Sequence, residues 1–189
     1  SYRYLVLGTV GATFFVIGLG LMYMMTGTLN MADLAEKLKA VQDTRTVLAA
    51  FAFLSVGLGL KLALFPMHAW LPNAYAYAPS VVTAFIAATA TKVAVYVYLR
   101  SFFTIFGPLY TFEMLRLDRF IVPLALIGII VASLVAVFQT NIKRMLAYSS
   151  VAQVGYMMLG IGFVSVAGLT GTLIHLFNHA VMKGALFLA

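Results

Sequence analysis

The sequence has no cysteine and very few acidic residues. The absence of cysteine excludes disulfide bonds, thiolate metal sites, iron–sulfur clusters and covalently attached haem. Only 9% of the 189 residues are charged, whereas an ordinary soluble domain has about 25%. Because a soluble fold of this size needs a polar exterior, the shortage of charge excludes a cytosolic enzyme domain, a disordered tail and a fibrous protein.

Hydrophobic residues make up 63% of the chain. They form six apolar segments, each close to the length of about 20 residues that crosses a bilayer, at about 5–25, 46–65, 79–103, 120–138, 145–166 and 169–189. The segments do not alternate in polarity as barrel strands do, so we expect helices. The composition predicts an all-α polytopic membrane protein, with about six transmembrane helices in a single domain. The start at Ser1 and the end within an apolar run predict an internal piece of a longer protein.

The basic residues give the chain a formal net charge of +7. They are scattered and form no patch, so we expect no nucleic-acid partner. All five acidic residues lie in two polar connections, residues 26–45 and 104–119. In the first connection, Leu34, Leu38 and Val41 recur at helical spacing, which predicts a short amphipathic helix at the membrane surface.

Three lysines lie inside the apolar segments, namely Lys61, Lys92 and Lys183. A lysine at the centre of a membrane helix costs about 2.5–3.5 kcal/mol, so its presence there points to a function. Near the end of a segment, a lysine can instead extend to the interface. Lys92 lies near the middle of its segment and Lys61 follows a long apolar approach, which favours a functional role for both.

Lys183 also ends a polar stripe. His175, His179 and Lys183 are spaced four residues apart, which places them on one face of a helix. Because histidine exchanges protons near neutral pH, the stripe predicts a proton pathway linked by water. Two alternatives remain open: a zinc site made by the two histidines, and histidines that hydrogen-bond to neighbouring helices. The zinc site lacks a third ligand nearby, so we predict no metal. Ser149, Ser150 and Gln153 in the preceding segment could hold water or join helices.

Prolines interrupt the sequence after Lys61, at positions 66, 72 and 79. Because proline removes a helical hydrogen bond, this pattern predicts a helix that breaks beside a membrane-embedded lysine. In a plainer interpretation, the prolines end the segment, and His68 and Trp70 lie at the membrane interface.

Three motifs carry a family resemblance, in the same order and with similar spacing. They are KLALFPMHAWLPNAYAYAPSVVTAFIAATATK at 61–92, FQTNIKRMLAYSSVAQVGYM at 138–157 and HLFNHAVMKGALFL at 175–188. The chain resembles the antiporter-like proton-translocating subunits of respiratory complex I, membrane-bound hydrogenases and Mrp cation/proton antiporters. The sequence of the first motif is most similar to that of the D-subunit branch of the Mrp antiporters.

The resemblance implies a fold of fourteen transmembrane helices with two inverted repeats. Residues up to about 104 would end the first repeat, and residues from about 120 to 189 would begin the second. It assigns Lys61 to a broken helix and Lys92 to the next helix, and it puts the 175–183 stripe on a central polar axis. The family commonly has Asp where this chain has Asn73 and Asn141, so we do not expect ion pairs at those positions.

The function implied is that of a proton-translocating subunit in a monovalent cation/proton antiporter complex. The alternative is a pump-arm subunit of an NADH:quinone oxidoreductase or a membrane-bound hydrogenase. In either case we expect no cofactor or redox centre in this chain. The expected partners are other membrane subunits, the lipid bilayer, and protons with Na⁺ or K⁺. The expected location is the bacterial cytoplasmic membrane.

Overall fold

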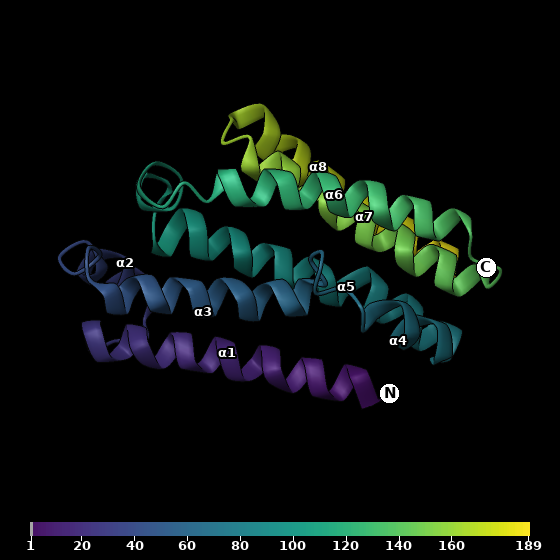
Figure 1. Cartoon of the computed structure of the whole chain (residues 1–189), viewed down its shortest axis with the longest axis horizontal. Helices are drawn as coiled ribbons and strands as arrows, with labels where there is room; N and C mark the ends of the chain where they lie inside the picture. Colours follow the sequence, from purple (N-terminus) through teal and green to yellow (C-terminus); the bar gives the residue numbers. More distant parts are fainter. Residues whose placement is uncertain (1) are drawn as a thin grey trace.

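The computed structural model describes residues 2–189, and the regular elements in this range are all helices. Six of them are long: α1 (Tyr2–Thr26), α3 (Arg45–Leu62), α5 (Ser80–Leu99), α6 (Asp118–Val137), α7 (Ile142–Gly162) and α8 (Val166–Leu188). The short ones are α2 (Met31–Leu38), α4 (Leu71–Tyr77) and two π-helical turns, η1 (Arg100–Ile105) and η2 (Leu109–Met114). The long helices lie beside one another along the longest axis of the molecule (Figure 1).

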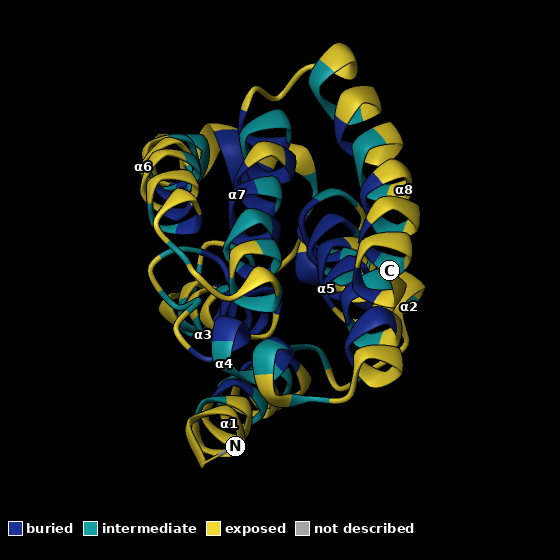
Figure 2. Cartoon of the chain, turned by 90° about the vertical axis from the view of Figure 1, so that its right-hand side faces the viewer, coloured by how far each residue is buried: buried dark blue, intermediate teal, exposed yellow. Residues whose placement is uncertain are grey.

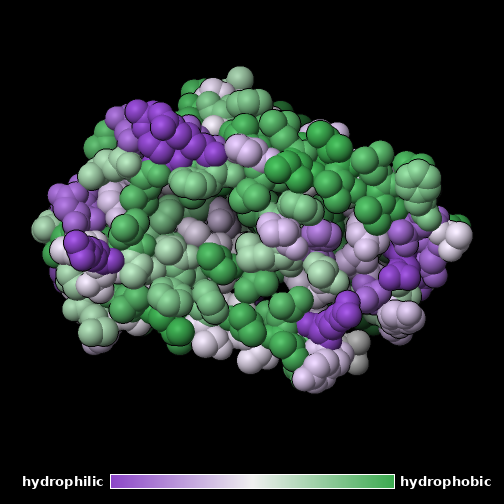
Figure 3. Space-filling model, in the orientation of Figure 1, coloured by the Kyte–Doolittle hydropathy of each residue, from purple (hydrophilic) through white to green (hydrophobic). Residues whose placement is uncertain are grey.

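The six long helices correspond to the six apolar segments of the sequence. Four helices are long and apolar enough to cross a membrane by length and composition: α1, α3, α5 continued through η1, and α6. Helices α7 and α8 have 21 and 23 residues, enough for a span at about 1.5 Å per residue, but they carry more polar side chains. On the face shown in Figure 3, hydrophilic residues gather towards the two ends and apolar residues lie between them. The predicted all-α polytopic membrane fold is confirmed.

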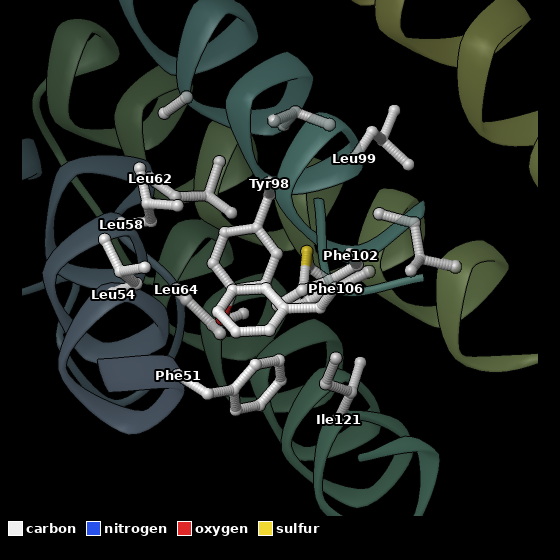
Figure 4. Packing of buried hydrophobic residues seen from close by; sticks show 14 of the residues in the cluster. Phe51, Leu54, Leu58, Leu62, Leu64, Tyr98, Leu99, Phe102, Phe106 and Ile121 are labelled. Atoms are coloured by element: carbon white, nitrogen blue, oxygen red, sulfur yellow. The ribbon is translucent and has the colours of Figure 1, made fainter. Parts of the chain in front are cut away.

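The helices pack in neighbouring pairs, with α1 against α3, α6 against α7, and α8 against both α5 and α7. Figure 2 shows α5 inside the bundle, while the outer faces of α1, α6 and α8 are exposed. An aromatic cluster joins α3 to the end of α5 (Figure 4). In it, the ring of Phe51 lies 4.9 Å from Phe106 and 5.4 Å from Phe102, and Tyr98 lies 4.3 Å from Phe102. Such pairs are stabilising beyond the apolar area that they bury.

The two polar connections lie at the same end of the bundle (Figure 1). Asn30 caps the start of helix α2, because its side chain accepts hydrogen bonds from the first turn, and Leu34 and Leu38 are buried. The predicted short amphipathic helix is therefore confirmed. The second connection is not a simple polar loop, because η2 buries Tyr110 and Phe112 against the bundle.

Helix α3 ends beside Lys61, as the prolines predict. Ala63 takes a left-handed conformation with φ 58°. Helix α4 then continues in the direction in which α3 runs, away from the end that carries the two polar connections (Figure 1). Trp70 ties the two pieces together, because its indole Nε1–H donates to the carbonyl oxygen of Leu60 at 2.8 Å. That carbonyl also accepts from the main-chain N–H of Ala63 at 3.2 Å, so the indole is its second donor at the end of α3. The indole is buried within the bundle, with Trp70 only 7% exposed. The alternative that His68 and Trp70 lie at the membrane interface concerns depth in the membrane and stays a prediction.

Candidate functional site: a buried polar axis

Lys92 lies inside the bundle, at the middle of α5, with 6% of its surface exposed. Its ammonium donates to the carbonyl oxygen of Ala87 and, at 3.4 Å, to the hydroxyl of Thr91. Both acceptors belong to α5 itself. A carbonyl can only accept, but a hydroxyl can accept from an ammonium or donate to a neutral amine. The Thr91 contact is therefore available to Lys92 in either protonation state.

Lys183 is buried between α7 and α8 and is 1% exposed. Its ammonium donates to the carbonyl oxygen of Leu146 at 2.9 Å and to the hydroxyl of Ser149 at 3.1 Å, both on α7. Like Lys92, it is thus held by one carbonyl and one hydroxyl. The interpretation of Ser149 as a residue that joins helices is confirmed.

His175 and His179 lie one turn apart on α8, and their rings are stacked with centroids 6.0 Å apart and planes 2° from parallel. His179 is completely buried, and neither of its ring nitrogens has a hydrogen-bond partner among residues 2–189. Among residues 2–189, no neighbouring helix hydrogen-bonds to His179, so the alternative of histidines held by neighbouring helices stays a prediction. Nε2 of His175 is also buried without a partner in this range. Within the same residues, no group of three or more histidine or acidic side chains is placed to hold a metal ion.

Helices α5 and α8 bring these groups together. They approach closely beside Lys183, where a Cβ atom on Gly184 would lie 3.7 Å from the Cβ of Ala88, one turn before Lys92. His179 lies one turn before Lys183 on α8, and both residues are buried. Side chains of α5 and α8 therefore form one polar axis, in which Lys92, His179 and Lys183 are buried and His175 is half-buried.

Lys61 differs from the other two lysines. It lies in the last turn of α3, within the bundle's length, but its side chain is exposed on the surface of this chain. Depth along a membrane helix does not determine which face of that helix is covered, so the predicted position of Lys61 within an apolar segment does not bury its side chain inside this chain. The ion pair found among residues 2–189 joins Lys37 to Asp33, so none of the three membrane lysines has an acidic partner there.

Sequence reasoning missed several groups that hold these lysines. Thr91 precedes Lys92 directly, and a polar residue next to a membrane lysine is a signal that could have identified it. The carbonyl oxygens of Ala87 and Leu146 have no such signal, because every residue carries one. At the end of the bundle near α4, Arg144 donates to the side-chain oxygen of Asn73 at 3.0 Å. This contact is a hydrogen bond and not an ion pair, as expected for asparagine.

Comparison with known proteins identifies the family. The whole chain, residues 1–189, matches the family described as NADH:quinone oxidoreductase/Mrp antiporter, transmembrane. The chain belongs to this family. It is a multi-pass membrane protein, and the resemblance predicted from the three motifs is confirmed.

Members of the NADH:quinone oxidoreductase/Mrp antiporter family include relatives of both predicted types. The chain is 46% identical over 191 residues to NADH-quinone oxidoreductase subunit N of Desulforudis audaxviator, a match that covers 99% of the chain and 37% of that protein. It is 33% identical over 190 residues to the D subunit of the Na⁺/H⁺ antiporter of Alkalihalophilus pseudofirmus, covering 100% of the chain and 37% of that protein. The chain thus spans little more than a third of these relatives.

A solved structure of the same family supports the fold. A chain of the Mrp complex from Dietzia sp. DQ12-45-1b superposes with a TM-score of 0.86 at 30% identity, over 98% of this chain and 33% of that one. The arrangement of helices described above is therefore the arrangement that this family uses.

Proposed function

We propose that this chain is the proton-conducting part of an antiporter-like subunit in a larger membrane complex. The supporting observation is the environment of Lys92 and Lys183: both are buried on adjoining helices and both are held by neutral oxygens. His179, one turn before Lys183 on α8, is buried without a hydrogen-bond partner among residues 2–189. A charged lysine without an acidic partner is expensive in a membrane interior. If the two lysines gain and lose protons in turn, proton transport explains why the protein keeps them despite this energetic cost.

In this proposal each residue has a distinct role. Lys61, at the broken helix, is the switch whose charge is held and released by an acidic partner outside the described residues. Lys92 takes up the proton within the bundle. His175, His179 and Lys183 carry it onwards along α8, through water between the stacked rings. The residues before and after the 104–120 connection would belong to two inverted repeats.

Two kinds of complex fit this proposal. The first is a monovalent cation/proton antiporter, which exchanges Na⁺ or K⁺ for protons. The second is the pump arm of an NADH:quinone oxidoreductase or hydrogenase, in which other subunits carry the redox centres. The identity of 46% with a quinone-oxidoreductase N subunit, against 33% with an antiporter D subunit, favours the second. Purification of the intact complex tests this: copurified flavin and iron–sulfur subunits support the redox-linked type, and their absence supports the antiporter.

The lysine roles are tested in the intact complex reconstituted in vesicles. We expect Lys61→Ala and Lys92→Ala each to abolish proton transport while the complex still assembles. Lys39→Ala is the matched control, because Lys39 is exposed at the end of α2. Near-normal transport in both membrane-lysine variants would contradict the proposal.

The histidine role is tested against the zinc alternative. We expect the double variant His175→Ala, His179→Ala to slow proton transport without changing the metal content of the purified complex. A loss of stoichiometric zinc from the variant would show that the histidines form a metal site instead.

A further inference from the structure

A cavity at the α4 end of the bundle lies outside the proposed pathway. It has a volume of about 180 Å³, and the residues that line it include Arg3 and Tyr4 of α1 and Trp70, Asn73 and Tyr77 at α4. The ring centroids of Tyr4 and Trp70 lie 5.3 Å apart and form one wall. Trp70 is itself held by its hydrogen bond to the end of α3. The cavity thus combines an exposed cation with aromatic rings, which membrane proteins place at the level of lipid headgroups.

A second guanidinium lies at the edge of this cavity. Arg144 of α7 donates to the side-chain oxygen of Asn73 at 3.0 Å, and Asn73 lines the cavity. Nε of Arg144 is buried and has no acceptor among residues 2–189. Because arginine offers five donors and binds phosphate oxygens in pairs, Arg144 keeps donors for an anionic group. The amide of Asn73 is neutral, so it leaves the positive charge of Arg144 uncompensated.

The α4 end of the bundle carries positive charge without negative charge. Besides Arg3 and Arg144, it contains Lys143, which donates to the carbonyl oxygen of Ala78 at the end of α4, at 3.1 Å. All five acidic residues of the chain lie in the connections 26–45 and 104–119, at the opposite end (Figure 1). The basic side chains at the α4 end therefore have no acidic neighbour in this chain, and they attract anionic groups from outside it.

The surroundings of the cavity favour a phospholipid over a soluble anion. The outer face of α1 is exposed (Figure 2), and it presents apolar side chains such as Leu5 and Val16. Leu5 follows Tyr4 directly, so this apolar surface begins at the cavity. An acyl chain can cover such a surface, whereas a free phosphate cannot. The ligand that fits both parts has an anionic headgroup and apolar chains.

We propose that this cavity binds the headgroup of an anionic phospholipid, such as phosphatidylglycerol. The guanidinium groups of Arg3 and Arg144 bind the phosphate, the rings of Tyr4 and Trp70 contact the glycerol backbone, and the acyl chains lie along α1. The lipid thereby links the start of α1 to α4 and, through Asn73, to α7. This site is separate from the proton pathway, so it goes beyond the proposed function and does not depend on it.

The test uses the intact complex, reconstituted in vesicles that contain a sub-saturating fraction of a photoreactive phosphatidylglycerol. Mass spectrometry quantifies the cross-linked lipid on chymotryptic peptides that carry residues 2–4 and 70–77. We expect Arg3→Gln to lower cross-linking about fivefold, the effect of one basic residue at an anionic surface. Arg119→Gln is the matched control and should leave cross-linking unchanged, because Arg119 is an exposed arginine at the opposite end of the bundle.

Asn73→Asp separates lipid binding from the stability of the fold. The new carboxylate adds a negative charge to the cavity lining and pairs with Arg144, so we expect cross-linking to fall at least as far as in Arg3→Gln. The free energy of unfolding should not fall, because the carboxylate keeps the contact with Arg144. Cross-linking as strong as in the parent complex, in both Arg3→Gln and Asn73→Asp, would overturn the site.

Competition identifies the ligand. Unlabelled phosphatidylglycerol should displace the photoreactive lipid from these peptides, and phosphatidylcholine, whose headgroup has no net charge, should be about fivefold less effective. Equal displacement by phosphatidylcholine would show a contact that any lipid can make. Displacement by inorganic phosphate would show a site for small anions. Either result would overturn the proposal of an anionic phospholipid.

Discussion

The ammonium of Lys183 on α8 donates to the main-chain carbonyl oxygen of Leu146 on α7, at 2.9 Å. The hydroxyl of Ser150 donates to the same carbonyl oxygen at 3.0 Å. The carbonyl oxygen of Leu146 therefore accepts two hydrogen bonds, one from the buried Lys183 and one from Ser150 of its own helix. Ser149 supplies the second acceptor for Lys183, so the two adjacent serines have different roles in one site.

This difference predicts the effect of replacing each serine. Ser149→Ala removes one of the two acceptors of a buried ammonium, and we expect the free energy of unfolding to fall by about 1.5–3 kcal/mol, the range for hydrogen bonds to charged groups. Ser150→Ala leaves both contacts of Lys183 in place and should have a clearly smaller effect. Thermal unfolding of the purified complex measures both. Equal destabilisation would contradict the assignment of Ser149 as the partner of Lys183.

Helical spacing alone was enough to predict part of the site. Residues four apart share a face, so His175 and His179 were expected to lie one above the other, and their rings are stacked. The break after Lys61 was predictable for a similar local reason, because proline removes a helical hydrogen bond and clashes with the preceding turn. Both features depend on interactions within one segment of chain.

The contacts between helices could not be predicted in this way. Which face of α3 is covered depends on the packing of α1 and α5, and this leaves Lys61 exposed in this chain. The Leu146 carbonyl that binds Lys183 has no side-chain signature. Likewise, its charged residues marked the 104–119 connection as polar, but Tyr110 and Phe112 within it pack into the core.

The close packing of α1 and α3 depends on glycine. A Cβ atom on Gly57 would lie 2.7 Å from the main-chain nitrogen of Phe15 and 2.8 Å from the carbonyl oxygen of Gly11. Because backbone atoms cannot move aside cheaply, we expect Gly57→Ala to destabilise the protein by about 1–3 kcal/mol. Gly20→Ala is the control, since nothing lies within 4 Å of its Cβ position. Thermal unfolding in the same detergent compares them, and equal stability of the two variants would contradict close packing at Gly57.

The pKa of Asp33, in the surface helix α2, is lowered from its ordinary value of 3.8, first by the hydrogen bond from Lys37 and then by that from Thr28. Because the folded-state pKa is the lower one, the pair stabilises α2 above pH 3.8, and the contribution is lost as the pH falls through the folded-state pKa. We expect Lys37→Ala to raise the pKa of Asp33 towards its ordinary value. Carboxyl-carbon NMR titration measures this.

The matched control for this titration is Lys39→Ala, which removes a nearby exposed base that does not contact Asp33. We expect a much smaller change in the pKa of Asp33 in this variant. A rise as large as that in Lys37→Ala would show that the general positive charge of the connection, and not the 2.9 Å hydrogen bond, lowers this pKa.

The contact between Asn73 and Arg144 joins α4 to the start of α7, with 3.0 Å between donor and acceptor. Asn73→Ala and Arg144→Ala should each destabilise the protein, and a double-mutant cycle should give a coupling energy of about 1–2 kcal/mol for this half-buried charged hydrogen bond. Asn73→Asp should instead stabilise the protein by up to about 1 kcal/mol, because it replaces a neutral acceptor with a carboxylate.

The two predictions at Asn73 share one control. In an Arg144→Ala background, the gain from Asn73→Asp should disappear, and high salt should reduce it in the parent background by screening the new ion pair. A gain that survives both conditions would show that the carboxylate acts on another group. In that case, the Asn73–Arg144 contact would not be what holds α4 against α7.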